Sequence, residues 1–372
     1  MKLSKILLVS LIAIGLTLPA LAQAARPKVQ IAVLLDTSSS MDGLIDQAKT
    51  QIWKIVNEFI ASKKAGSRPL IEVALMEYGK DSLPASEGYI RIIQSLTTDL
   101  DKVSEELFAL RTNGGHEFCG QVISVATQKL EWSKRPGDLK VIVIAGNEAF
   151  NQGNVSYKIS CKQAIRQGIM INTIFCGKFD EGVRTFWKDG AVLADGHFMN
   201  IDQNRRAPQI AAPQDAEIAR LGGEMNKTYI GYGKRGRKAK MRQAAQDSNA
   251  KSAAPAVMAE RAVYKSSAAY SNSGWDLADA VKDKKVKLDE MEADDLPEPM
   301  RKMDGKQREA YVKAQSAKRA EIQKKIQKLN VERKKYVAKK QKEQAKSGTK
   351  TLDAAMIDSI RSQAVKKGYK FE

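Results

Sequence analysis

The chain has 372 residues, 43% of them hydrophobic and 28% charged, with a formal net charge of +19 at pH 7. After the first 24 residues no stretch is apolar enough to cross a bilayer, which excludes an integral membrane protein. The sequence contains no phosphate-binding glycine loop, no zinc-ligand spacing and no evident acid–base pair, so we expect a protein that is not an enzyme.

Residues 1–24 have the pattern of an export signal. Lys2 and Lys5 give a positive start, an apolar stretch follows at 6–18, and residues 22–24 (Ala-Gln-Ala) form a small-x-small cleavage site. The apolar stretch is short for a membrane anchor and Pro19 follows it, so the pattern predicts cleavage after Ala24. We therefore expect an exported protein, periplasmic if the source is a Gram-negative bacterium and secreted otherwise.

Strands and helices alternate along the predicted globular region. Short apolar runs predict buried strands at 29–35, 71–78, 140–145 and 169–176, and further extended stretches at 89–96, 197–201 and 229–232. Helical periodicity is present at 43–61, 100–110, 118–130, 157–167, 182–189 and 214–225. This alternation predicts an α/β fold: a doubly wound, mainly parallel sheet covered by helices on both faces.

The first predicted strand ends in a polar cluster that contains Asp36, Ser38 and Ser40. In open α/β sheets, ligands bind at the carboxyl edge of the strands, where this cluster is expected. One carboxylate and two hydroxyls are hard oxygen donors that suit Mg²⁺, Mn²⁺ or Ca²⁺. The cluster therefore predicts a divalent cation site, and the alternative is a strand-to-helix turn capped by serine without a metal.

The spacing D-x-S-x-S between a strand and a helix resembles the metal-ion-dependent adhesion site of the von Willebrand factor type A (VWA) family. The runs at 145–153 (AGNEAFNQG) and 194–204 (ADGHFMNIDQN) are similar to those of a subgroup of exported bacterial VWA-domain proteins. The resemblance covers residues 27–233. It implies a VWA/Rossmann-like fold and a site where a ligand carboxylate completes the metal shell.

Two further loops of the site differ from the family pattern. The family's second loop supplies a threonine after a Gly-Gly turn, and its third loop supplies an aspartate after the central strand. Here His116 follows the turn of Gly114 and Gly115, with Glu117 next, and Gly146 occupies the aspartate position. The resemblance implies a site that is intact in its first loop and altered in the other two. His116 could indicate a transition metal, but one histidine among oxygens is a weak signal, and a rim residue is the expected role.

The altered loops leave two outcomes open. In the first, Glu117, with Asn147 or Glu148, replaces the missing oxygens and keeps a divalent cation, for which Mg²⁺ is the expected ion. In the second, the pocket has lost its metal and binds by hydrogen bonds alone. Glu117 offsets the lost ligands only if its side chain reaches inward.

Three cysteines occur in the chain: Cys119, Cys161 and Cys176. Export permits disulfides. We expect a Cys161–Cys176 disulfide because the elements that carry these residues are sequential neighbours. A Cys119–Cys161 disulfide and three buried thiols are the alternatives, and one cysteine is left over in either pairing.

The positive charge is concentrated in the second part of the chain. From Lys234 to the C-terminus the net charge is +16, whereas the preceding part is close to neutral. This asymmetry predicts a VWA domain at 25–233, about 210 residues that can fold alone. The segment 234–300 is expected to be a flexible linker with marginal helices, and 301–372 a basic helical, coiled-coil-like region.

The strongest helix of the basic region is predicted at 307–344, with a final short helix at 351–364. Ile322 and Ile326 belong to a partial apolar stripe, which Arg319 and Arg333 interrupt, so a long stable coiled coil is not expected. A helix that packs on its own domain, or a short helical hairpin, is equally consistent with this pattern.

These observations lead to two hypotheses for function. The first is a non-catalytic exported binding module that captures a protein ligand at a partly degenerate metal-ion-dependent adhesion site. The second is an envelope scaffold that acts through its basic helical tail, with a vestigial metal site. For the tail, an anionic envelope surface is the expected partner. Export and the lack of an aromatic stacking pattern argue against nucleic acid.

Overall fold

The computed structural model describes residues 26–202, 209–344 and 352–371. The predicted export signal lies outside these residues. Within them, no helix has an apolar run long enough to span a bilayer.

A six-stranded sheet forms the centre of the first half of the chain, in the order β4-β3-β1-β5-β6-β7. Only β4 is antiparallel to its neighbour; the other pairs are parallel. The strands of this sheet are β1 (Lys28–Asp36), β3 (Leu70–Tyr78), β4 (Ile90–Thr97), β5 (Leu139–Gly146), β6 (Met170–Cys176) and β7 (Phe198–Ile201). The predicted α/β fold class is confirmed, and β4 lies at the sheet edge as expected.

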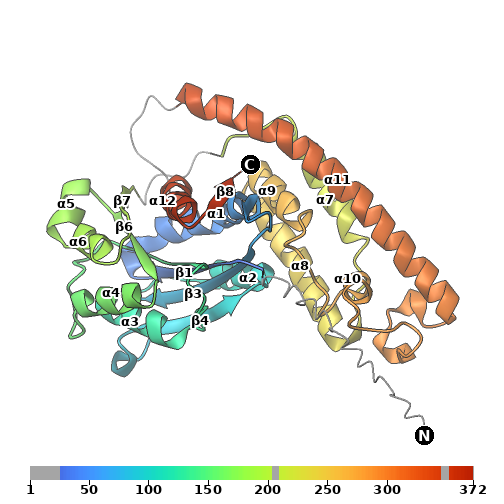
Figure 1. Cartoon of the computed structure of the whole chain (residues 1–372), viewed down its shortest axis with the longest axis horizontal. Helices are drawn as coiled ribbons and strands as arrows, with labels where there is room; N and C mark the ends of the chain where they lie inside the picture. The colour runs from blue at the N-terminus through green and yellow to red at the C-terminus, as the bar shows by residue number, and fades with distance from the viewer. Residues whose placement is uncertain (1–25, 203–208, 345–351, 372) are drawn as a thin grey trace, which may run out of the picture.

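Helices cover both faces of the sheet, with α1 and α12 on one side and α3 and α4 on the other (Figure 1). The helices of the first half are α1 (Asp42–Ile60), α2 (Leu100–Ala109), α3 (Cys119–Lys129), α4 (Tyr157–Arg166), α5 (Phe179–Arg184) and α6 (Trp187–Val192). The single helix predicted at 182–189 is interrupted at Phe186, which has a left-handed backbone (φ 70°). Short 3-10 turns occur at η1 (Ser39–Met41) and η2 (Ala85–Glu87).

The second half of the chain is helical and packs on the first. Its elements are α7 (Asp215–Asn226), α8 (Gly233–Ala253), α9 (Pro255–Lys265), α10 (Leu277–Lys282), α11 (Gly305–Gln344) and α12 (Leu352–Lys366), with 3-10 turns η3 (Ala293–Asp295) and η4 (Glu298–Met300). The strand predicted at 229–232 is wrong, because this segment makes only an isolated bridge between Gly231 and Asp276.

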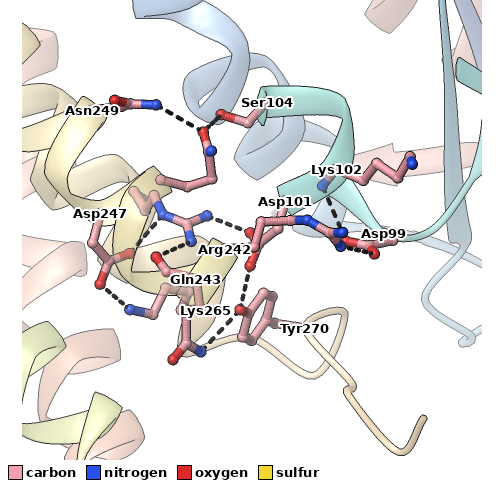
Figure 2. Close-up of polar contacts among 12 residues, drawn as sticks. Asp99, Asp101, Lys102, Ser104, Arg242, Gln243, Asp247, Asn249, Lys265 and Tyr270 are labelled. Carbon is pink, nitrogen blue, oxygen red and sulfur yellow. Dashed lines mark hydrogen bonds and ion pairs between the residues drawn. The ribbon is translucent and has the colours of Figure 1, made fainter. Parts of the chain in front are cut away.

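The flexible linker expected at 234–300 is instead occupied by α8, α9 and α10. Helix α8 has few large apolar residues, whereas α9 buries several, and buried polar groups help to dock both helices. Arg261 of α9 is fully buried, donates to Asp101 (2.6 Å) and Asp247 (2.7 Å), and stacks on Trp53 of α1. Figure 2 shows that Lys265 also donates to Asp247 and that Tyr270 donates to Asp101.

The long helix α11 lies on the outside of the molecule and packs on α7, α9 and α10 (Figure 1). Arg319 and Arg333, which interrupt its apolar stripe in the sequence, are both buried. Arg319 donates to Asp276 (2.7 Å), and Arg333 donates to Asp215 (2.6 Å). The two arginines therefore extend the docking face of α11 by pairing with carboxylates of the helices beneath it.

The C-terminal helix α12 returns to the sheet. Its Met356 and Ile360 are buried in the same apolar core as α1. Asn172 of β6 and Gln363 exchange two amide hydrogen bonds, of 3.0 and 2.9 Å. Beyond α12, β8 (Tyr369–Phe371) pairs with β2 (Ser62–Lys64) in a two-stranded antiparallel sheet. The last elements of the chain thus complete the face of the sheet that α1 begins.

Candidate functional site

Asp36 is the last residue of β1, which lies between β3 and β5 at the centre of the sheet. Its side chain is fully buried, and its Oδ1 accepts a hydrogen bond of 2.7 Å from the backbone N–H of Ser38. The Ser38 and Ser40 hydroxyls lie 3.3 Å apart. One carboxylate and two hydroxyls therefore converge where the turn leaves the strand, as the D-x-S-x-S spacing predicts.

Glu117 reaches this cluster from the loop that precedes α3. The residue is only 4% exposed, and its carboxyl group lies beside that of Asp36. His116 is exposed, and its ring packs beside those of Tyr89 (5.5 Å between centroids) and Phe118 (6.0 Å). The loop thus brings a carboxyl group to the interior and leaves the imidazole at the rim.

Gly146, at the end of β5, has a steric reason to lack a side chain. A Cβ atom there would lie 2.5 Å from the Tyr78 hydroxyl and 3.1 Å from Oδ2 of Asp36. Tyr78 is fully buried and donates a hydrogen bond of 3.0 Å to the Ala145 carbonyl. The tyrosine therefore occupies the space that an aspartate at position 146 would need, and Glu117 brings a carboxyl group from another loop.

Asn147 and Glu148 follow Gly146 and have different surroundings. The amide of Asn147 donates to the Ser40 hydroxyl at 3.2 Å, while its Oδ1 is buried and has no partner among the described residues. Glu148 is exposed and accepts a hydrogen bond of 3.2 Å from Gln152. Asn147 therefore belongs to the cluster, whereas Glu148 acts on it from the rim through its charge.

Both carboxyl groups of this cluster have a raised pKa. Burial, opposed by hydrogen bonds, raises the pKa of Asp36 to about 6. Burial, followed by the neighbouring charge of Asp36, raises the pKa of Glu117 to about 9. At neutral pH and without a cation, the pair therefore retains a proton, because two adjacent buried carboxylates repel each other.

The donor atoms fit a hard cation better than a transition metal. Oδ2 of Asp36 is buried and has no hydrogen-bond partner in the described part of the chain. Around it are the oxygens of Ser38, Ser40 and Glu117, and such oxygen sets suit Mg²⁺, Mn²⁺ or Ca²⁺. Within the described ranges, no three His, Cys, Asp or Glu side chains gather as a ligand group. Any cation here would therefore depend on serine and asparagine oxygens besides the two carboxyl groups.

Gly79, which follows β3, is a residue of the site that the sequence analysis missed. Its backbone is left-handed (φ +80°), and a Cβ atom would lie 2.7 Å from Cγ of Glu117 and 2.9 Å from Oδ1 of Asp36. Only glycine lets the carboxyl pair approach this turn. A glycine directly after a buried strand was the available signal in the sequence.

Replacing Gly79 with alanine should destabilise the protein by about 1 kcal/mol through its left-handed backbone and by a further 1–3 kcal/mol, roughly, through overpacking. Gly66→Ala is the matched control, because Gly66 has a similar backbone (φ +77°) and a Cβ atom there would have no neighbour within 4 Å. Urea unfolding would compare the two. Equal losses in both variants would contradict a crowded carboxyl pair at this turn.

The three cysteines are buried free thiols, so the expected Cys161–Cys176 disulfide is wrong. Side chains alternate between the faces of a strand, and Cys176 belongs to the core on the α1 side of the sheet. Cys161 belongs to the core on the opposite side, together with Cys119. The sheet therefore separates the two residues expected to pair.

Comparison with known proteins agrees with this fold. A family profile described as von Willebrand factor type A domain matches residues 30–210. One similar solved structure is proximal thread matrix protein 1 from the mussel byssus with a zinc-occupied MIDAS motif (15% identity, TM-score 0.37). The match covers 48% of this chain and 43% of that chain.

Two other solved structures are similar over much of their own length. The SpRpn10 VWA domain is 16% identical, with 47% of this chain and 88% of that chain covered and a TM-score of 0.35. BatB from Bacteroides thetaiotaomicron is 15% identical, with 47% and 90% covered and a TM-score of 0.36. No curated protein sequence matches the chain.

Proposed function

Since the chain contains a von Willebrand factor type A domain at residues 30–210, and such domains commonly mediate protein–protein interaction, we propose that this protein is a non-catalytic exported binding module. It captures a protein ligand at the carboxyl edge of the sheet, where Asp36 ends β1. In this proposal the ligand contributes a carboxylate, and the site binds it with a divalent cation, most simply Mg²⁺.

The observation that carries the proposal is Oδ2 of Asp36, which lies beside the Glu117 carboxyl group and has no hydrogen-bond partner in the parts of the chain that the structure describes. A buried carboxylate oxygen without a hydrogen bond costs free energy, and a second carboxyl group beside it adds repulsion. A bound cation removes both costs. A buried polar atom without a partner calls for a physical explanation, and a bound ion or ligand is one that fits this oxygen set.

Each residue of the cluster has a defined part in the proposed site. Asp36 and Glu117 supply negative charge, and Ser38 and Ser40 supply neutral oxygens. The amide of Asn147 donates to the Ser40 hydroxyl, and its Oδ1, which has no partner within the described ranges, is available to a cation. A bound divalent cation would neutralise the carboxyl pair and present an open position to an acidic side chain of the ligand.

Titration of chelator-treated protein with Mg²⁺, Mn²⁺ and Ca²⁺ by calorimetry tests the proposal. A chain that begins at Arg26 keeps every described element. We expect saturable binding, with a dissociation constant on the order of 10⁻⁴ to 10⁻³ M, and loss of that binding in Asp36→Ala. A lack of heat in the unmodified protein at millimolar metal would refute the metal-dependent form of the proposal and favour the scaffold alternative.

Glu117→Gln should have opposite effects on stability and metal binding. The amide keeps the shape and needs no proton, whereas the Glu117 carboxyl group, with its pKa raised to about 9, must take up a proton on folding at pH 7. Without metal, the free energy of unfolding at pH 7 should therefore rise by on the order of 2 kcal/mol. Metal affinity should fall, because one charged ligand is lost. Glu148→Gln is the control, and its exposed position predicts little change in stability. If Glu117→Gln destabilises the metal-free protein, Glu117 is a structural acid and not a ligand.

A further inference from the structure

The outward side of α11 carries a row of lysines that the proposed binding site does not use. Helical spacing places positions 324, 328, 335, 339 and 342 on one side of α11, opposite the buried Ile326. All five lysines are exposed. We call Lys324, Lys328, Lys335, Lys339 and Lys342 the lysine ridge.

The lysine ridge has little internal neutralisation. The ion pairs on the outer part of α11 join Lys325 to Glu321 and Lys340 to Glu343. None of the five ridge lysines has a carboxylate partner among the described residues. The buried arginines of the same helix are, by contrast, fully paired with acids beneath it. Positive charge on α11 is therefore divided between an inner set that docks the helix and an outer set that remains available.

The shape of the ridge fits a flat partner. At 1.5 Å per residue, positions 324 to 342 span about 27 Å along the helix. Figure 1 shows α11 along the outer edge of the molecule, with α7 and α10 on its inner side. Val331 is the one large apolar side chain exposed along this stretch (56%) among the described residues. The ridge can therefore lie on a surface but has no apolar face for insertion.

We propose that the lysine ridge docks this protein on an anionic lipid bilayer surface. Lysines are compact charges on flexible stems, which suit mobile monovalent headgroups. The ridge has no arginine forks for phosphate recognition and no aromatic rings on which bases could stack, so nucleic acid is the less suitable polyanion. The Asp36 site lies on a different element, so docking through α11 would leave it free to bind its own ligand.

Co-sedimentation with vesicles tests this docking. The chain should begin at Arg26, so that the apolar N-terminal stretch does not itself bind lipid. Each lysine close to an anionic surface strengthens binding about fivefold. A triple variant with Lys328→Gln, Lys335→Gln and Lys339→Gln should therefore bind vesicles with 30% phosphatidylglycerol more weakly by on the order of 100-fold. Binding should also fall steeply as the salt concentration rises from 50 to 500 mM, because salt shortens the distance over which exposed charges attract each other.

A control with the same change in net charge separates the ridge from the overall charge. Lys129→Gln, Lys162→Gln and Lys188→Gln alter exposed lysines of α3, α4 and α6, and the proposal expects less than a threefold change. Equal losses in both triple variants would overturn it. It would also be overturned if the unmodified protein ignored anionic vesicles, bound phosphatidylcholine vesicles equally, or bound only duplex DNA through the same lysines.

Discussion

A chain that ends at Gln344 should fail to form a stable fold, although it keeps the whole central sheet. The deletion removes α12 and β8, and with them Met356, Ile360 and Tyr369, each at most 3% exposed. Burial of a large apolar side chain contributes about 1.5–3 kcal/mol, so the summed loss approaches the 5–15 kcal/mol that roughly stabilises a whole protein. The deletion also exposes the apolar partners of these residues on α1 and the sheet.

Circular dichroism during heating would measure this effect. The intact chain should unfold cooperatively, and the shortened chain should show either no cooperative transition or a much lower midpoint. The same reasoning applies to a fragment of residues 25–233, which additionally lacks the α9 side chains that cover α1. A fragment with an unchanged midpoint would mean that the C-terminal helices pack on an already complete domain.

Two point substitutions on α12 test the same contact without a deletion. Ile360→Ala should cost about 2–5 kcal/mol, because Ile360 is fully buried against the core. Val365→Ala should cost less than about 0.5 kcal/mol, because Val365 is 56% exposed. Urea unfolding of the full chain gives both values. Equal costs would contradict the docked position of α12.

The α/β part of the fold could be predicted because its elements carry local patterns. The run predicted at 140–145 is apolar from Val141 to Ala145, and β5 is buried along its full length. In α1, apolar residues recur with helical spacing along the sequence. These patterns do not depend on distant parts of the chain, so their assignment from the sequence is confirmed.

The docking of the C-terminal half could not be predicted in the same way. Helix α8 contains few large apolar residues, so its composition resembles a linker. Its buried residues, such as Asp247, become favourable only when distant partners such as Arg261 pair with them. The contact between Asn172 and Gln363 joins positions 191 residues apart. No local pattern in the sequence encodes such pairs.

The candidate site could be predicted only in part. Asp36, Ser38 and Ser40 share a short motif whose geometry follows from the strand and the turn. The inward position of Glu117 depends on Gly79 and Gly146, which leave space for it and for Tyr78. The sequence therefore identified Glu117 as a candidate ligand but could not decide between the two directions its side chain could take.

Arg261→Met should be among the most destabilising substitutions in the second half of the chain. It leaves the buried carboxylates of Asp101 and Asp247 without their shared partner, and breaking a buried ion pair in this way costs about 3–5 kcal/mol. Arg242→Met is the control on the neighbouring helix α8. Arg242 pairs with Asp99 (Figure 2) and with Glu105, which are both more exposed acids. Its loss should therefore cost about 0–1 kcal/mol.

The pH dependence of unfolding tests whether the difference in cost between Arg261→Met and Arg242→Met is electrostatic. Burial alone would raise the pKa of Asp247, but the charges of Lys265 and Arg261 outweigh it and hold that pKa below its usual range. A carboxyl group whose pKa is lowered by folding stabilises the fold at pH values above its pKa in the unfolded chain, which is about 4. This stabilisation is lost as the pH falls through the pKa of the folded state.

The cost of Arg261→Met should therefore be largest near pH 7 and should shrink as pH falls below about 4, where Asp247 takes up a proton first in the unfolded chain and, at lower pH, in the folded protein. Urea unfolding of both arginine variants at pH 7 and pH 3 measures the change. Adding Asp101→Asn to Arg261→Met should recover part of the loss at pH 7, because one unpaired buried charge is removed. A cost that stays constant with pH would instead assign the role of Arg261 to its packing on Trp53, whose ring lies 4.5 Å from the guanidinium.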